Sequence, residues 1–169
     1  MSRMTYISKT DYVLWRACPK NAWLRIHKPD LYYSTELTEY EQSIIDTGIE
    51  VERVARKLFP QGVLITGIKT EAQESTLQCM ASNTQTLFQA VFQREQCLAA
   101  IDVLQCHPGT GAYSILEIKS STEVKAEHLY DLAFQVVLLR QHGTPVIQAS
   151  IIHPQLRSAS VSGVNAVFR

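Results

Sequence analysis

The chain carries AAIDVL at residues 99–104 and, after a turn, YSILEIKSS at residues 113–121. Strands this apolar are usually buried, and burying unpaired charges costs several kcal/mol. Because side chains alternate along a strand, Glu117 and Lys119 share one face of the second stretch. Two acids and a lysine in the middle of a sheet need a physical reason. A divalent metal held by Asp102 and Glu117, with Lys119 beside it, supplies one.

Length and composition indicate one globular domain. The chain has 169 residues, enough to bury a core, of which 46% are hydrophobic and 19% are charged. We expect a single domain over residues 1–169. Within it we expect a helical part to about residue 38, a core over about residues 39–153 and a weakly patterned tail over residues 154–169.

Charge is unevenly distributed along a chain whose formal net charge is zero. The basic residues of the first part are Arg3, Lys9, Arg16, Lys20, Arg25 and Lys28, and the acidic ones are Asp11 and Asp30. This local excess of positive charge fits either a phosphate-binding patch or a solvated helix face. In the first case the nucleic-acid ligands would be Lys9, Arg16, Lys20 and Arg25.

The cysteines indicate a reducing compartment. They are Cys18, Cys79, Cys97 and Cys106, with no CxxC spacing. Isolated cysteines in apolar or helical contexts are typical of free thiols rather than of a disulfide framework. No apolar run approaches a membrane span in length, and the N-terminus has no signal-peptide pattern. We therefore expect a cytoplasmic protein that does not contact a membrane.

Hydrophobic periodicity predicts an α/β protein. Ser8 is a helix N-cap, Pro19 opens a second helix, and the turn residues at 107–111 separate two strands of a hairpin. The expected elements are helices at 10–15, 19–27, 39–59, 71–82 and 127–141, strands at 63–66, 86–93, 97–106, 112–120 and 146–152, a loop at 29–38, and a weak strand within 157–169. The order helix, three strands, helix, strand predicts an α/β sandwich around a central sheet.

Glu52 on the long predicted helix is a further candidate. It follows Gly48 by one turn and lies on the side of the helix that carries Val51 and Ala55. We expect its carboxylate to face the sheet, with Gly48 permitting a close approach of the helix. The alternative is an ion pair with Arg56, four residues later, on a solvated face.

Asp102, followed on the next strand by EIK at residues 117–119, resembles the signature of the PD-(D/E)xK nuclease superfamily. The similarity is greatest to its RecB-like branch, which includes the CRISPR-associated adaptation nucleases. Further similar motifs are ISKT at residues 7–10 with Cys18-Pro19, GIEVE at residues 48–52, SST at residues 120–122 and Gln135 on the next helix. The resemblance covers about residues 5–153.

The resemblance implies a restriction-endonuclease-like core, in which a helix, a three-stranded antiparallel meander, a helix and a strand follow one another. It also implies N-terminal helices packed on a central mixed sheet. The implied activity is that of a Mg- or Mn-dependent deoxyribonuclease, an exonuclease that hydrolyses phosphodiester bonds of single-stranded or linear DNA. Proteins of this branch often work beside a helicase or a second nuclease domain, which are therefore the expected partners.

The resemblance assigns roles to individual residues. The metal ligands would be Glu52, Asp102, Glu117 and the carbonyl group of Ile118. These hard oxygen donors suit Mg²⁺ or Mn²⁺. The catalytic residues would be Asp102, Glu117, Lys119 and Gln135. Lys119 would act on the attacking water or on the transition state, Gln135 would position Lys119 or the DNA, and Ser120 would contact the nucleic acid.

Several of these assignments have simpler alternatives. Asp102 and Lys119 would then form only a cross-strand ion pair, and Gln135 would hydrogen-bond only the backbone. On the predicted helix, His128 and Asp131 lie on the same side as Gln135 and are candidates for a supporting role.

Some residues depart from the pattern of the branch. Leu139 stands where the branch often has a tyrosine that contacts nucleic acid. Cys18 matches one ligand of the iron–sulfur cluster that some members bind, but no cysteine follows Cys106, so we expect no such cluster from this chain alone. For Trp15 and Trp23 we favour packing between the first two helices over stacking on bases.

A second interpretation is a catalytically silent module with a nuclease-like fold, which binds nucleic acid or a protein partner in a larger assembly. The zero net charge, the missing tyrosine and the short chain favour it. The presence of both acids and the lysine favours the enzyme. Divalent-metal binding distinguishes the two interpretations.

Overall fold

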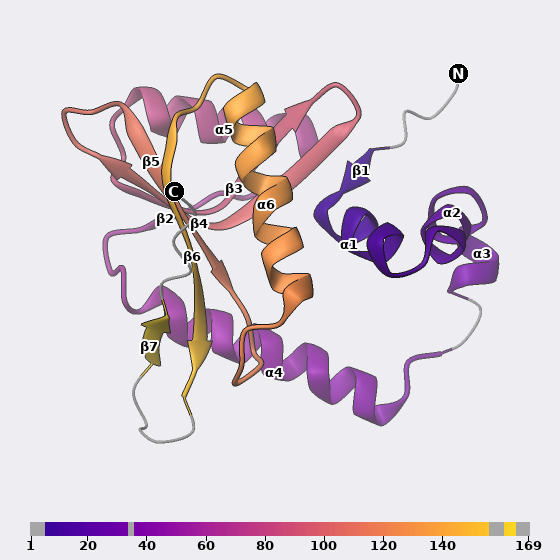
Figure 1. The fold of residues 1–169 in the computed structure, drawn as a ribbon. Coiled ribbons are helices and arrows are strands. Elements are labelled where there is room, and N and C mark those ends of the chain that lie inside the picture. Colours follow the sequence, from indigo (N-terminus) through magenta and orange to yellow (C-terminus); the bar gives the residue numbers. More distant parts are fainter. Residues whose placement is uncertain (1–5, 34–35, 156–160, 165–169) are drawn as a thin grey trace.

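The computed structural model describes residues 6–33, 36–155 and 161–164, which form a mixed β-sheet covered by helices (Figure 1). The elements are β1 (Ile7–Ser8), α1 (Lys9–Ala17), α2 (Pro19–His27), α3 (Pro29–Tyr32), α4 (Glu39–Arg56), β2 (Val63–Leu64), α5 (Lys69–Ala81), β3 (Thr86–Arg94), β4 (Cys97–His107), β5 (Ala112–Ile118), α6 (Ala126–Gln141), β6 (Val146–Pro154) and β7 (Val161–Val164). The predicted α/β class is therefore confirmed.

The sheet has the strand order β2-β3-β4-β5-β6-β7, with β1 pairing β4 outside that path. β3, β4 and β5 form an antiparallel meander, as predicted. β6 joins β5 in parallel after α6, and β2 pairs β3 in parallel. Because a parallel pair needs a crossover connection, α6 lies across the sheet between β5 and β6 (Figure 1).

Two hydrophobic cores lie on the two faces of this sheet. The larger core lies under α5 and α6, and its largest fully buried side chains are Leu87, Phe92, Ile101, Leu104, Ile115, Leu132, Leu138, Leu139 and Ile151. The smaller core lies under the C-terminal part of α4 and consists of Ala55, Phe88, Val103, Ile118 and Ile152. Within the described residues, no helix combines the length and the apolar composition needed to cross a membrane.

Three predicted elements differ most clearly from the structure. The expected loop at 29–38 contains α3, because Pro29 has the backbone angle of a first helical position and its carbonyl accepts from Tyr33 N–H at 2.8 Å. The long helix ends at Arg56, where tighter turns precede Pro60. The strand expected at 63–66 keeps only two residues. The weak strand expected in the tail is β7, and residues 156–160 and 165–169 lie outside the described residues.

We predicted that the N-terminal helices pack on the sheet, but α1 packs mainly against α2 and α6. α1 begins with a capping box, in which Ser8 and Asp11 bond each other's backbone N–H groups, and it packs against α6, where Tyr12 and Phe134 stack at 5.6 Å. Only β1 joins the sheet, pairing with the first residues of β4 beyond the end of β5. Lys9 follows β1 directly, so it enters the fold where β4 and β5 separate.

β3 and β4 share an irregularity opposite Asp102. Gln89 on β3 has a φ angle of 54°, in the left-handed region that a side chain rarely adopts. Leu87 and Ala90 both pack in the larger core, although they would point to opposite faces of an uninterrupted strand. This conformation costs about 1–2 kcal/mol, and backbone strain of this kind concentrates at functional sites.

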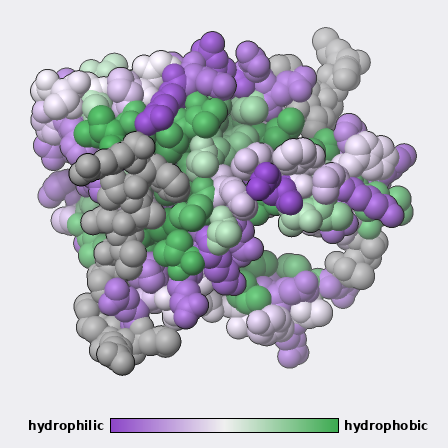
Figure 2. Space-filling view, viewed as in Figure 1, coloured by the Kyte–Doolittle hydropathy of each residue, from purple (hydrophilic) through white to green (hydrophobic). Residues whose placement is uncertain are grey.

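The first half of α4 extends away from the sheet. Its apolar side chains Ile44, Ile45 and Ile49 are exposed. Figure 2 shows an open gap between the N-terminal helices and this part of α4, with apolar surface along its border. A Cβ atom at Gly48 would have no atom within 4 Å. The prediction that Gly48 permits a close approach of the helix to the sheet is therefore wrong. At Gly48, α4 lies too far from the sheet for any of the sheet's described atoms to contact a Cβ at this position.

Gly48→Ala is expected to raise the free energy of unfolding by about 0.5–1 kcal/mol, because alanine favours a helix and restricts the unfolded chain. Urea unfolding followed by circular dichroism measures this change. Gly62→Ala is the matched control of opposite sign, since its Cβ would lie 2.3 Å from the ring of Phe88. A Gly48→Ala protein less stable than wild type would contradict the open environment described here.

Candidate functional site

Six residues from four parts of the chain meet near the C-terminal end of β5, where the inner strands β4 and β5 separate. β4 contributes Asp102, β5 contributes Glu117, and Lys119 follows β5 directly. Asp131 and Gln135 come from α6, and Lys9 comes from the start of α1. The sequence predicted that Asp102, Glu117, Lys119 and Gln135 come together, and the structure confirms their proximity. Lys9 and Asp131 complete the cluster.

Glu117 is the most tightly held acid of the cluster. Its side chain is buried, with a residue exposure of 1%. Lys9 Nζ donates to both carboxylate oxygens at 2.8 and 3.0 Å, Lys119 Nζ donates to Oε1 at 2.8 Å, and Gln135 Nε2 donates to Oε2 at 2.6 Å. Burial opposes ionisation, but the two ammonium groups outweigh it and lower the pKa of Glu117 to about 2. The carboxylate is therefore anionic at neutral pH.

Asp102 has weaker partners than Glu117. Its Oδ2 accepts from the backbone N–H of Ile118 at 2.8 Å, and its Oδ1 accepts from Gln89 Nε2 at 3.3 Å. Lys9 Nζ lies 3.7 Å from Oδ1. Burial and the repulsion of Glu117 raise the pKa of Asp102 to about 7, which Lys9 and the Ile118 N–H only partly offset. Of these two acids, Asp102 is therefore the one whose charge is less well compensated.

Asp131 was predicted only as a supporting residue, yet it is an integral part of the cluster. Its Oδ2 accepts from Lys119 Nζ, and its Oδ1 accepts from Gln135 Nε2 at 3.1 Å. Burial and the nearby Glu117 carboxylate raise the pKa of Asp131. The sequence signal is its position four residues before Gln135, which places both side chains on one face of α6.

Lys119 and Gln135 are both tied to the acids. Lys119 bridges Glu117 and Asp131, and although burial opposes its charge, these two carboxylates raise its pKa. Gln135 is fully buried and donates to the same two acids, so the alternative of purely backbone hydrogen bonding is wrong. Its Oε1 is buried without a hydrogen-bond partner among the described residues.

Both interpretations of Glu52 from the sequence, a carboxylate that faces the sheet and an ion pair with Arg56, describe part of its environment. Its Oε1 accepts from Arg56 at 2.6 Å, which is the predicted i,i+4 ion pair. The same oxygen accepts from Gln89 Nε2 at 2.5 Å, and Gln89 in turn contacts Asp102. Glu52 also lines one cavity of about 310 Å³ together with Asp102 and Glu117. The helix face is therefore not simply solvated, and Gln89 connects Glu52 to the cluster.

The predicted nucleic-acid ligands lie in different environments. Lys9 binds the acids, and Arg25 pairs with Asp11 at 2.6 Å. Arg16 lies 4.4 Å from the centre of the Tyr130 ring. Of the other two, Lys20 is exposed on α2, and Ser120 lines the cavity that holds the acids.

Trp15 and Trp23 do not pack inside the protein. Their exposures are 53% and 52%, so the favoured packing interpretation is wrong. Both line a groove of about 480 Å³ between α1 and α2, with Tyr12 and Ala22 among its other residues. Aromatic faces are therefore available to a ligand next to the helix that carries Lys9.

The remaining candidate residues are His128, Leu139 and the cysteines, and His128 lines a cavity together with Lys119 and Asp131. His128 accepts a hydrogen bond from Lys125 N–H at 3.2 Å, and burial together with Lys119 lowers its pKa, which favours the neutral imidazole. Leu139 is fully buried in the larger core. All four cysteines are free and only partly buried, Cys18 among them.

The donor set of the cluster fits a hard divalent cation, although no preformed ligand group is present. Among the residues that the structure describes, no three His, Cys, Asp or Glu side chains are arranged to hold a metal ion. The ammonium of Lys9 instead lies among Asp102, Glu117 and Asp131. Carboxylate oxygens are the ligands that Mg²⁺ and Mn²⁺ prefer, and the three acids of the cluster outnumber its two lysines.

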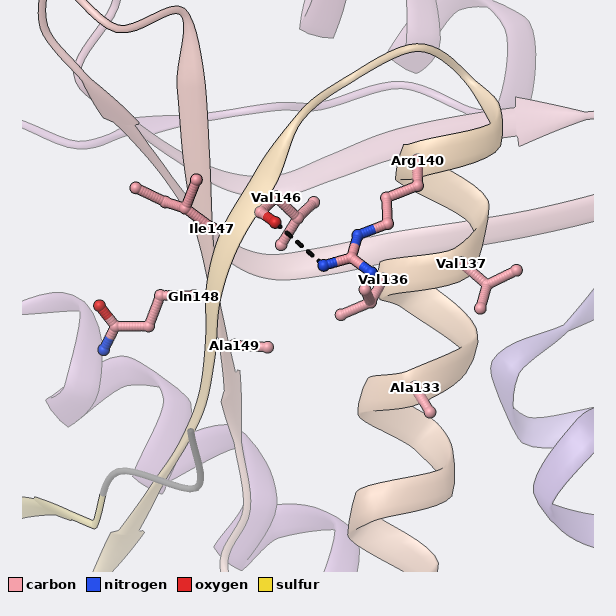
Figure 3. A pocket seen from close by; sticks show the side chains of 8 residues that line it. All are labelled: Ala133, Val136, Val137, Arg140, Val146, Ile147, Gln148 and Ala149. Carbon is pink, nitrogen blue, oxygen red and sulfur yellow. Dashed lines mark hydrogen bonds between the residues drawn. The ribbon is translucent and has the colours of Figure 1, made fainter. Parts of the chain in front are cut away.

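A different cavity lies between α6 and β6 (Figure 3). Its volume is about 160 Å³, and its walls are mostly apolar, with Val136, Val137 and Ala149 among them. Its one charged residue, Arg140, donates to the carbonyl of Val146 at 3.3 Å. This cavity carries no acid or base, so it does not compete with the carboxylate cluster as a site of chemistry.

Comparisons with protein-family models and with curated protein sequences found no match. The resemblance to RecB-like nucleases therefore depends on the motifs quoted above and their order. The geometry of the carboxylate cluster is an observation separate from this resemblance.

Proposed function

We propose that the protein is a metal-dependent deoxyribonuclease of the RecB-like type, which hydrolyses phosphodiester bonds in single-stranded or linear DNA. The observation that carries this proposal is the convergence of Asp102, Glu117 and Lys119 at one cavity, where the acid of β4 meets the acid of β5 and the lysine that follows it. The chain order is α4, β2, α5, the β3–β5 meander, α6 and β6, and it contains the helix, meander, helix and strand of the core that the resemblance implies.

Bound at Asp102, Glu117 and the Ile118 carbonyl, with Glu52 nearby, Mg²⁺ or Mn²⁺ would neutralise charge on the scissile phosphate and make the attacking water more acidic. Glu117 is anionic and fixed by three donors, so it can serve as a ligand without first losing a proton. The cavity beside it has a volume of about 310 Å³.

Lys119 would act on the reacting groups. Its pKa is raised by Glu117 and Asp131 against the effect of burial, so it remains an ammonium at neutral pH. It lines the cavity, with 21% of its side chain exposed. From there it can donate a hydrogen bond to the attacking water or to a phosphate oxygen that gains negative charge. Gln135 holds both carboxylates that orient Lys119, and is a positioning residue.

The groove lined by Trp15 and Trp23 supports a single-stranded substrate. Unpaired bases stack on exposed aromatic side chains, whereas those of a duplex are already stacked on one another. Trp15 lies six residues after Lys9 on α1, which is about 9 Å along the helix axis. A strand whose phosphate enters the cavity would therefore bring neighbouring bases close to this groove.

Cleavage of end-labelled DNA tests the proposed function. Single-stranded, linear duplex and covalently closed circular DNA are each incubated with Mn²⁺, Mg²⁺ or EDTA. We expect loss of label from single-stranded or linear DNA in the presence of metal only, and little cleavage of the circle. Glu50→Gln, which alters an exposed ion pair with Arg53 on α4, should cleave like wild type. Cleavage that persists in EDTA would contradict a metal-dependent mechanism.

One observation favours the catalytically silent module as a second candidate. Lys9 lies among the acids, so a cation of the chain itself already compensates part of their charge. A module of this kind would bind single-stranded DNA through its aromatic groove and cleave nothing. Absence of cleavage and of Mn²⁺ binding, with DNA binding retained, would favour this candidate over the enzyme.

A further inference from the structure

We propose that Lys9 is an internal counter-ion which a divalent cation must displace, and that the phosphate groups of the substrate favour this displacement. The inference rests on the proposed function, because it concerns the same carboxylates. It goes beyond that function by assigning Lys9 the role of coupling metal binding to DNA binding.

The position of the Lys9 ammonium carries the proposal. Its Nζ lies 2.8 and 3.0 Å from the two oxygens of Glu117, 3.7 Å from Asp102 Oδ1 and 3.9 Å from Asp131 Oδ1. These three acids come from β4, β5 and α6. A single cationic group thus lies within 4 Å of oxygens of all three acids, including Asp102 and Glu117, which are the proposed metal ligands.

The fold fixes the backbone of Lys9, whereas its long side chain is held, among the described residues, only by its ion pairs with the acids. Two interactions hold the backbone on either side of Lys9. β1 pairs with β4 just before this residue, and the capping box of Ser8 and Asp11 fixes the first turn of α1. The side chain has four rotatable carbon–carbon bonds and is 20% exposed at the cavity. Its ammonium can therefore leave the acids without any change of the fold.

A divalent cation and the ammonium cannot share this position. Like charges within about 4 Å repel each other strongly at a site shielded from water. Metal binding at Asp102 and Glu117 therefore requires the Lys9 ammonium to move outward. Thr10 and Ser120 line the same cavity and lead toward solvent.

The displaced ammonium then needs a new anionic partner. A phosphate group of a DNA strand at the cavity supplies one and forms a charge-assisted hydrogen bond with it. DNA thereby stabilises the arrangement in which metal is bound. By thermodynamic linkage, DNA should raise the affinity for metal, and metal should raise the affinity for DNA by the same factor.

Mn²⁺ titration, with free Mn²⁺ measured by electron paramagnetic resonance, tests the proposal. Wild type, Lys9→Ala, Lys9→Gln and the exposed-lysine control Lys57→Ala are titrated with and without a cleavage-resistant phosphorothioate oligonucleotide. Without DNA, both Lys9 variants should bind Mn²⁺ at least about tenfold more tightly than wild type. DNA should raise the affinity of wild type and Lys57→Ala by a similar factor and that of the Lys9 variants by much less.

Equal or weaker Mn²⁺ binding by the Lys9 variants would overturn the proposal and leave the nuclease function intact, provided that wild type binds Mn²⁺. Absence of Mn²⁺ binding in every folded protein would overturn both. Lys9→Gln keeps a donor to Glu117 if Lys9→Ala fails to fold. Wild type alone gives a further test, because Mg²⁺ should shift the ¹⁵Nζ resonance of Lys9 toward that of a solvated lysine, and an unchanged resonance in the metal-bound protein would refute displacement.

Discussion

Lys119→Ala is expected to slow DNA cleavage severely and to leave Mn²⁺ binding in place. Lys119 donates to Glu117 and Asp131, whereas Asp102 has its own hydrogen bond from Ile118 N–H. Removing the lysine therefore leaves the proposed metal ligands present but removes the positive charge aimed at the reacting phosphate. Loss of one such preorganised donor slows catalysis by about 10²–10³-fold. Single-turnover cleavage and Mn²⁺ titration of the same preparation measure the two effects.

Lys119→Arg is the control for charge alone. The planar guanidinium keeps the positive charge but does not reproduce the contact geometry of an ammonium. We expect this variant to bind Mn²⁺ and to cleave more slowly than wild type. Cleavage by Lys119→Ala at the wild-type rate would remove Lys119 from the mechanism. Joint loss of cleavage and Mn²⁺ binding would instead make the lysine part of the metal site.

Asp102→Asn is expected to abolish Mn²⁺ binding and, in the metal-free protein, to increase stability. The pKa of Asp102 is raised from 3.8 to about 7 on folding, mainly by burial and by Glu117. Folding therefore opposes ionisation of this carboxylate, and the ionised form reduces stability. The cost is absent below pH 3.8, grows as the pH rises and is complete above pH 7. The neutral amide avoids this cost.

Urea unfolding in the presence of a chelator measures this effect. Above pH 7, Asp102→Asn should exceed wild type by at least about 1 kcal/mol in free energy of unfolding, and the difference should shrink toward pH 4. Glu117→Gln is the matched control of opposite sign, since the lowered pKa of Glu117 means that its ionised form stabilises the fold. An Asp102→Asn protein that is less stable than wild type above pH 7 would contradict the electrostatics described here.

Much of the fold follows from local sequence signals. The periodicity of α6 and the turn between β4 and β5 predict their elements nearly to the residue, and the meander places Asp102 beside Glu117. Gln135 joins them because α6 crosses from β5 to β6 over the same face of the sheet. These contacts depend on the alternation of side chains along the strands and on the short connections between β4, β5, α6 and β6. The sequence encodes both directly.

The remaining features depend on long-range geometry. Lys9 meets Glu117 only because two residues of β1 pair with β4, an arrangement that no local pattern specifies. The left-handed conformation of Gln89 arises within a strand whose residues give no turn signal. Gly48 has the spacing expected of a contact with the sheet, yet α4 extends past the sheet at that point. Tertiary packing decides all three.

The central claim is that the carboxylate cluster is the metal centre of a hydrolytic site. Anomalous X-ray scattering from crystals soaked in Mn²⁺ tests it most directly. The account predicts an Mn²⁺ peak bonded to oxygens of Asp102 and Glu117, with Lys9 Nζ moved away from Glu117. A soaked crystal with no Mn²⁺ at these acids, and with Lys9 still bound to Glu117, would contradict it.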